Sequence, residues 1–68
     1  MELNHKTTAE NLYRLRGDRT KKEVADAVGV TEKSISQYEH GERIPNDAVK
    51  VRLAAYYNKT AEELFYNS

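Results

Sequence analysis

Two short helix patterns separated by a glycine turn occupy the segment from Thr20 to Gly41, which reads TKKEVADAVGVTEKSISQYEHG. The apolar residues of the first pattern recur with the spacing of one helix face, at Val24, Ala25 and Val28. Gly29 follows at once and favours a helix end there, because glycine adopts positive φ without a steric penalty. The segment therefore predicts a helix that stops abruptly at Gly29.

A second helix pattern begins directly after this stop. Thr31 is a favourable N-cap, and Ile35 and Tyr38 lie three residues apart on the inner side of the helix that follows. Ala25 lies four residues before Gly29, where two crossing helices leave no room for a larger side chain, and Ile35 can fill the space between them. Two short helices joined by a tight turn that contains glycine form the helix-turn-helix motif.

The pattern extends beyond this motif on both sides. The residues concerned are Thr20, Glu23 to Ala25, Val28 to Thr31, Ser34 to Glu39, Gly41, Arg43, Pro45, Leu53, Ala54 and Glu63 to Phe65. With them the sequence resembles the DNA-binding domain of the Cro/repressor-type helix-turn-helix family (XRE), from about residue 9 to about residue 66. The resemblance implies an all-α, lambda-repressor-like bundle of five short helices and a transcriptional repressor of phage or mobile-element type.

Length and composition restrict the other classes of protein. Sixty-eight residues make one small domain, in which every helix must contribute to the core. The chain has no cysteine and two isolated histidines, so we expect neither a disulfide framework nor a typical zinc site. No acid, base and nucleophile stand at a useful spacing, so no catalytic residue, cofactor or small-molecule ligand is expected. The sequence shows no membrane span or signal peptide, and we expect a cytoplasmic protein.

The charges balance overall but are unevenly placed. Eleven basic and eleven acidic residues cancel, and a neutral total by itself argues poorly for nucleic-acid binding. Five cations nevertheless lie within nine residues, at Arg14, Arg16, Arg19, Lys21 and Lys22. This cluster favours a surface that attracts phosphate.

Start and stop residues divide the chain. We expect a flexible arm over residues 1–7 and the DNA-binding domain over 8–66, with the helix-turn-helix at 20–41 and the recognition helix at 31–40. Capping boxes are predicted at Thr7 with Glu10, Thr20 with Glu23, and Thr60 with Glu63. Gly41 is expected to cap the end of the recognition helix.

A fourth helix is predicted after Pro45, capped by Asn46 or Asp47 and running to about Tyr57. Its apolar residues, Val49, Leu53 and Tyr56 or Tyr57, have helical spacing. Asp47 and Lys50 depart from the family, which often has apolar residues at their positions. Leu64 and Phe65 are expected to close the core from a fifth helix.

The outward face of the recognition helix is expected to contact DNA bases in the major groove. Its residues are Glu32, Lys33, Ser36 and Gln37. Gln37 can pair with adenine and Lys33 with guanine, whereas the short hydroxyl of Ser36 is permissive. Glu32 can accept from cytosine, or it can cap the helix and exclude wrong sequences.

Phosphate contacts are expected around this helix. Lys21 and Lys22 lie in the first turn of the preceding helix, whose N-terminus attracts anions. The family most often has glutamine at the position of Lys21. Arg43 and the backbone beside it are expected to contact phosphate, and His40 is either a polar helix end or a further phosphate contact.

The resemblance also implies a structural ion pair between Glu39 and an arginine of the first helix. Arg14 matches by ungapped counting, whereas Arg16 matches if the connection between the first two helices is two residues shorter. We favour Arg16, because Gly17 to Arg19 forms a tight link.

One recognition helix reads only a few base pairs, so we expect a homodimer on double-stranded operator DNA, with half-sites about 34 Å apart. The expected contact surface is the C-terminal helix with Tyr56, Phe65 and Tyr66. The alternative is a protein-interaction module, such as an antitoxin that binds a partner toxin.

Overall fold

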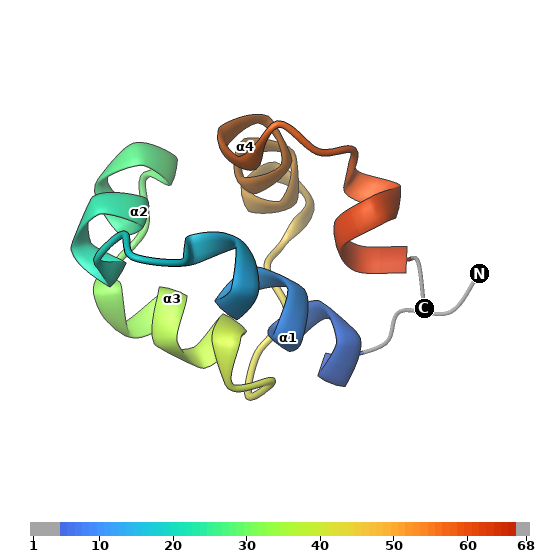
Figure 1. Ribbon diagram of the computed structural model, residues 1–68, viewed down its shortest axis with the longest axis horizontal. Coiled ribbons are helices and arrows are strands. Elements are labelled where there is room, and N and C mark those ends of the chain that lie inside the picture. Colours follow the sequence, from blue (N-terminus) through green and yellow to red (C-terminus); the bar gives the residue numbers. More distant parts are fainter. Residues whose placement is uncertain (1–4, 67–68) are drawn as a thin grey trace.

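The computed structural model describes residues 5–66, which form an all-α fold, as predicted. The elements in chain order are α1 (His5–Arg16), α2 (Lys21–Val28), α3 (Glu32–Glu39), α4 (Asp47–Tyr57) and a π-helical turn, η1 (Glu62–Tyr66). Helices α2 and α3 form the helix-turn-helix pair (Figure 1). Helix α1 packs against both α3 and η1, whereas α4 packs against α2, so the pair is supported on two sides.

Polar side chains set the starts of α2, α3 and α4. Thr20 accepts the N–H of Glu23 at 3.0 Å, Thr31 that of Ser34 at 3.1 Å, and Asn46 that of Val49 at 3.0 Å. Each bond satisfies a backbone donor that helix geometry leaves without an internal partner. Of the two alternatives for α4, Asn46 is therefore the cap and Asp47 is the first helical residue.

Glycines with positive φ end both helices of the pair. Gly29 has a φ of 75°, and the N–H of Val30 bonds back to the carbonyl of Ala25 at 3.0 Å. Gly41 has a φ of 73°, but the predicted cap was wrong by one residue: α3 ends at Glu39, its C-cap is His40, and Gly41 follows that cap. These conformations favour glycine, which has no Cβ to clash.

The predicted start of the first helix is wrong. Thr7 lies inside α1, which already begins at His5, so it is not an N-cap. Neither His5 nor Lys6 breaks a helix as glycine or proline would, and the helix extends over them. Of the arm predicted over residues 1–7, residues 5–7 therefore belong to α1, and residues 1–4 lie outside the described residues.

The core draws on every element. Its buried residues are Leu12, Val24, Ala25, Val28, Ile35, Tyr38, Val49, Leu53, Ala54, Tyr57, Leu64 and Phe65. Phe65 is only 1% exposed, so its prediction as part of a dimer surface is wrong: the ring is used to close the monomer's own core. Tyr56 and Tyr66 are half-buried at the edge of the core.

The C-terminal turn is held by two sets of polar contacts. The capping box of Thr60 and Glu63 is confirmed, with reciprocal bonds of 3.0 and 3.1 Å. The fifth helix is a short π-helical turn. Lys50, although charged, is buried on α4, and its Nζ donates to the hydroxyl of Tyr66 at 2.8 Å. This contact gives the buried amine a polar partner.

Candidate nucleic-acid interface

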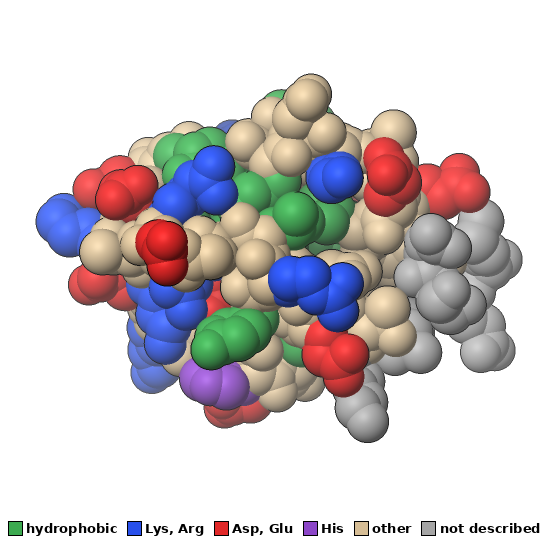
Figure 2. All heavy atoms as spheres, viewed as in Figure 1, with side chains coloured by type: hydrophobic (Ala, Val, Ile, Leu, Met, Phe, Trp, Pro, Cys, Tyr) green, Lys and Arg blue, Asp and Glu red, His purple; other side chains and the backbone are tan. Residues whose placement is uncertain are grey.

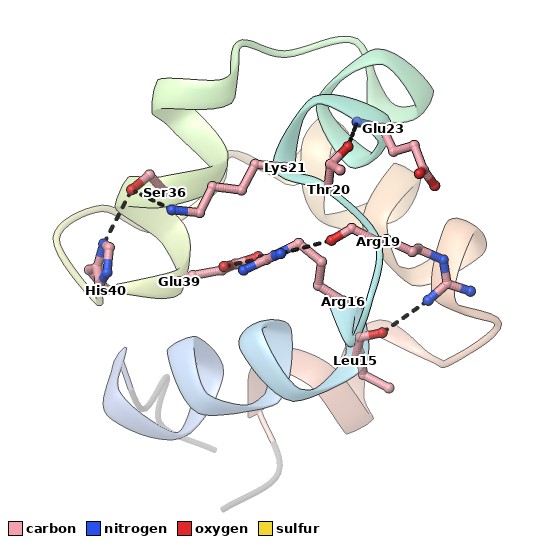
Figure 3. A network of polar contacts seen from close by, with 9 residues as sticks. All are labelled: Leu15, Arg16, Arg19, Thr20, Lys21, Glu23, Ser36, Glu39 and His40. Atoms are coloured by element: carbon pink, nitrogen blue, oxygen red, sulfur yellow. Dashed lines mark hydrogen bonds and ion pairs between the residues drawn. The ribbon is translucent and has the colours of Figure 1, made fainter.

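Helix α3 is fixed to α1 by an ion pair. The Nε of Arg16 donates to both carboxylate oxygens of Glu39, at 2.8 and 3.1 Å (Figure 3). The hydrogen bond from Arg16 to Glu39 raises the pKa of Arg16, so the guanidinium stays charged. Arg16, and not Arg14, is thus the partner of Glu39. The pair sets the position of the C-terminal end of α3.

The two faces of α3 differ as helical geometry requires. Ile35 and Tyr38 are buried against the rest of the molecule, whereas Glu32 and Lys33 are exposed. The remaining two residues of the predicted base-reading set, Ser36 and Gln37, are half-buried. Lys and Arg side chains gather with acidic ones on the side formed by α2 and α3 (Figure 2).

A chain of polar contacts joins the start of α2 to the end of α3. Lys21 Nζ lies 3.4 Å from the Ser36 hydroxyl, which in turn lies 3.3 Å from Nδ1 of His40 (Figure 3). The carboxylate of Glu42 lies 3.9 Å from the same Nδ1. Lys21 and His40, both predicted to bind phosphate, therefore contact the same hydroxyl. That hydroxyl belongs to Ser36, which was predicted to read a base.

A similar arrangement involves the loop after α3. Arg43 NH1 lies 3.5 Å from the hydroxyl of Ser34, which accepts a bond from the Thr31 hydroxyl at 3.0 Å. The guanidinium of Arg43 also lies over the ring of Tyr38, 5.8 Å from its centroid. Ser34 was not among the residues predicted for this surface. Its position three residues after the N-cap Thr31 was a usable signal.

Three members of the basic cluster between α1 and α2 have partners within the protein. Arg16 binds Glu39, and Arg19 lies over the rings of Tyr56 and Tyr57, at 5.5 and 5.8 Å. Burial raises the pKa of Tyr57 to about 12, so its hydroxyl stays neutral beneath this cation. Lys22 is exposed and pairs with Asp26 at 3.2 Å.

Comparison with known proteins places this geometry in a family. A profile described as helix-turn-helix matches residues 11–64. The chain belongs to this helix-turn-helix family. No curated protein matches it. Among solved structures it is similar to the SOS-response transcriptional repressor LexA from Eubacterium rectale, with a TM-score of 0.81 and 25% identity, covering 94% of this chain and 72% of that one.

Membership of the helix-turn-helix family supports DNA binding and transcription regulation as the activity of this protein, and not enzyme catalysis. Among the described residues, no group of three or more His, Asp or Glu side chains could hold a metal ion. In the part of the chain that the structure describes, each helix is too short or too polar to cross a membrane.

Proposed function

We propose that this protein binds double-stranded DNA at a specific operator, with α3 in the major groove, and represses transcription there. The observation that carries the proposal is the arrangement of α3. Its inner face is fixed by the core and by the pair of Arg16 and Glu39, while its outer face is polar and has cations on both edges. The similarity to LexA, a transcriptional repressor by name, supports repression over activation.

Base recognition falls to the middle of the outer face. Lys33 is exposed and donates to guanine O6 and N7, and Gln37 pairs through its amide with adenine. Glu32 accepts from cytosine N4 or rejects other bases by repulsion. The hydroxyl of Ser36 lies on the same side but is already engaged by Lys21 and His40.

Phosphate contacts hold the helix in the groove. Lys21 and Lys22 occupy the first turn of α2, where the helix dipole adds to their attraction for an anion. His40 at the C-terminal end of α3 and Arg43, whose guanidinium lies beside Ser34, serve the same purpose. A domain held in this way over a promoter represses transcription by excluding the polymerase. We propose that the protein is a repressor of phage or mobile-element type and that it acts in the cytoplasm.

Two copies are proposed to bind together. One α3 reaches only a few base pairs, and half-sites on one face of DNA are about 34 Å apart. The Cα atoms extend over 30 × 21 × 21 Å, so two copies with a shorter dimension along the DNA have room on such half-sites. These dimensions are compatible with a homodimer on an inverted repeat.

Selection of bound sequences from random duplex DNA, at roughly physiological salt, tests the function. We expect an enriched inverted repeat. A Lys33→Ala/Gln37→Ala variant that folds normally serves as the control and should lose the enrichment. Absence of any enriched sequence with the native chain would contradict the proposal and would direct attention to a protein partner, such as a toxin.

A further inference from the structure

We infer that Ser36 and Ser34 are positioning residues, whose hydroxyls hold Lys21 and Arg43 ready to bind phosphates of the two DNA strands. Ser36 therefore does not read a base. The inference rests on the proposed function, since it concerns the way in which the same surface binds DNA.

The first observation is the engagement of the Ser36 hydroxyl. A hydroxyl has one hydrogen to donate and two lone pairs to accept. Lys21 approaches it from α2 and His40 from the end of α3, at 3.4 and 3.3 Å. These two contacts take two of the three bonding places, so a contact to a base would have to be a third bond on a hydroxyl that two side chains already engage. An ammonium group has three N–H donors, so Lys21 can bind a phosphate oxygen while it keeps its bond to Ser36.

The second observation is the matching contact on the other edge of α3. Ser34 and Ser36 are two residues apart, which separates them by about 200° around a helix. Lys33 and Gln37, four residues apart, lie on one line between them. Ser34 holds Arg43 as Ser36 holds Lys21, with a contact of 3.5 Å. The two cations therefore lie on opposite edges of the line that faces the bases.

This arrangement fits the shape of the major groove. A phosphate backbone runs along each side of the groove, so a helix lying in it has one strand beside each of its edges. Lys21 then contacts a phosphate of one strand and Arg43 a phosphate of the other. Such contacts fix the orientation of a recognition helix without carrying sequence information.

The serines contribute by limiting the motion of these cations before DNA arrives. Lysine and arginine side chains lose much rotamer freedom when they are fixed. A cation that is already held near its binding position loses less freedom at the moment of binding, and the complex is tighter for that reason. Tyr38 assists on one side, because the guanidinium of Arg43 also lies over its ring.

A double-mutant cycle on Lys21 and Ser36 tests the inference, with binding measured on the selected operator and on an unrelated duplex over a range of salt concentrations. Ser36→Ala should weaken binding to both duplexes about three- to tenfold and leave the base preference unchanged. Ser36→Thr, which keeps the hydroxyl, should restore most of the affinity. Lys21→Ala should lower the salt slope by about one, and adding Ser36→Ala to it should cost little more.

A double-mutant cycle on Arg43 and Ser34 should give the same result: the double variant should lose less affinity than the sum of the losses of the two single variants. The crossed pair of Ser36→Ala with Arg43→Ala is the matched control and should be additive, since the two residues hold different edges. Circular dichroism of each variant separates loss of folding from loss of binding.

The outcomes separate the inference from the function on which it rests. A native chain that binds no duplex overturns the proposed function. A native chain that binds its operator, combined with a Ser36→Ala variant whose preference changes at one base pair, overturns the positioning role alone. The positioning role is also overturned if the losses of affinity of Lys21→Ala and Ser36→Ala add up in the double variant.

Discussion

Arg16 and Glu39 join α1 to α3 through one guanidinium nitrogen that donates to both carboxylate oxygens, at 2.8 and 3.1 Å. The side chain of Glu39 is only 3% exposed, and that of Arg16 is 15% exposed. Removing the arginine would leave a carboxylate that is shielded from water and has lost its counter-charge.

Arg16→Ala is therefore expected to lower the free energy of unfolding by about 3 kcal/mol. In a domain of this size that is a large part of the total free energy of unfolding. Urea denaturation measures the loss. Arg14→Ala is the control: Arg14 is exposed, and its removal should change the stability by less than about 0.5 kcal/mol. Equal losses in the two variants would contradict the assigned pairing.

Gln37→Ala should relax the preference at one base pair and cost about 1 to 3 kcal/mol on that sequence only. Lys22→Ala should weaken binding to all duplexes alike and lower the salt slope by about one. Affinity measurements on the operator and on single base-pair variants distinguish the two effects. The separation of base-reading from phosphate-binding residues is wrong if both variants behave alike.

Gly29→Ala should destabilise the fold by about 1 kcal/mol, because Gly29 has a φ of 75° that a Cβ disfavours. Lack of space is not the cause, since the new Cβ would lie 3.5 Å from the nearest side-chain atom, NH1 of Arg52. Gly29→Asn should cost less, because asparagine tolerates this conformation. Thermal unfolding of the native chain, Gly29→Asn and Gly29→Ala checks this order of stability. If crowding by Arg52 were decisive, Gly29→Asn would be less stable than Gly29→Ala, because asparagine is the larger residue.

The capping box of η1 predicts a dependence on acid. The backbone N–H of Thr60 donates to the carboxylate of Glu63 and, with the side chain of Thr60, lowers the pKa of Glu63 below its ordinary value of 4.5. Because the folded-state pKa is depressed, this stabilisation is present above the ordinary value and is lost as the pH falls through the folded-state pKa.

Melting temperatures of the native chain and Glu63→Gln, measured from roughly pH 6 to pH 3, test this dependence. Glutamine keeps a side-chain acceptor for the capping bond but carries no charge. The advantage of the native chain should shrink as the medium becomes more acidic. A constant difference over the whole range would show that the charge of Glu63 has no part in the cap.

Local features of the fold were predictable from the sequence, because they depend on neighbouring residues. Thr20, Thr31 and Gly29 act as caps and stops within three or four positions of their partners. The start of α1 was missed for a related reason. A favourable cap at Thr7 does not prevent a helix from beginning earlier when the preceding residues tolerate it.

Contacts between distant residues were not predictable in the same way. Lys21 and Ser36 are 15 positions apart, and only the packing of α2 on α3 brings the ammonium to the hydroxyl. The burial of Lys50 likewise depends on Tyr66, which is 16 positions away. The choice of Arg16 over Arg14 could be argued from the shortness of the link, because that link fixes which side of α1 faces Glu39.

The link between α1 and α2 is exposed but tightly bonded. Arg19 donates its N–H to the Arg16 carbonyl at 3.0 Å and receives NH1 of Arg16 on its own carbonyl at 2.8 Å. Its guanidinium also reaches back to the carbonyl of Leu15 at 3.1 Å. A protease needs a segment that can leave the surface and extend. Trypsin can therefore cut after Arg19 only when these bonds open, and the rate of cleavage at this link reports how often the bonds around Arg16 and Arg19 open together.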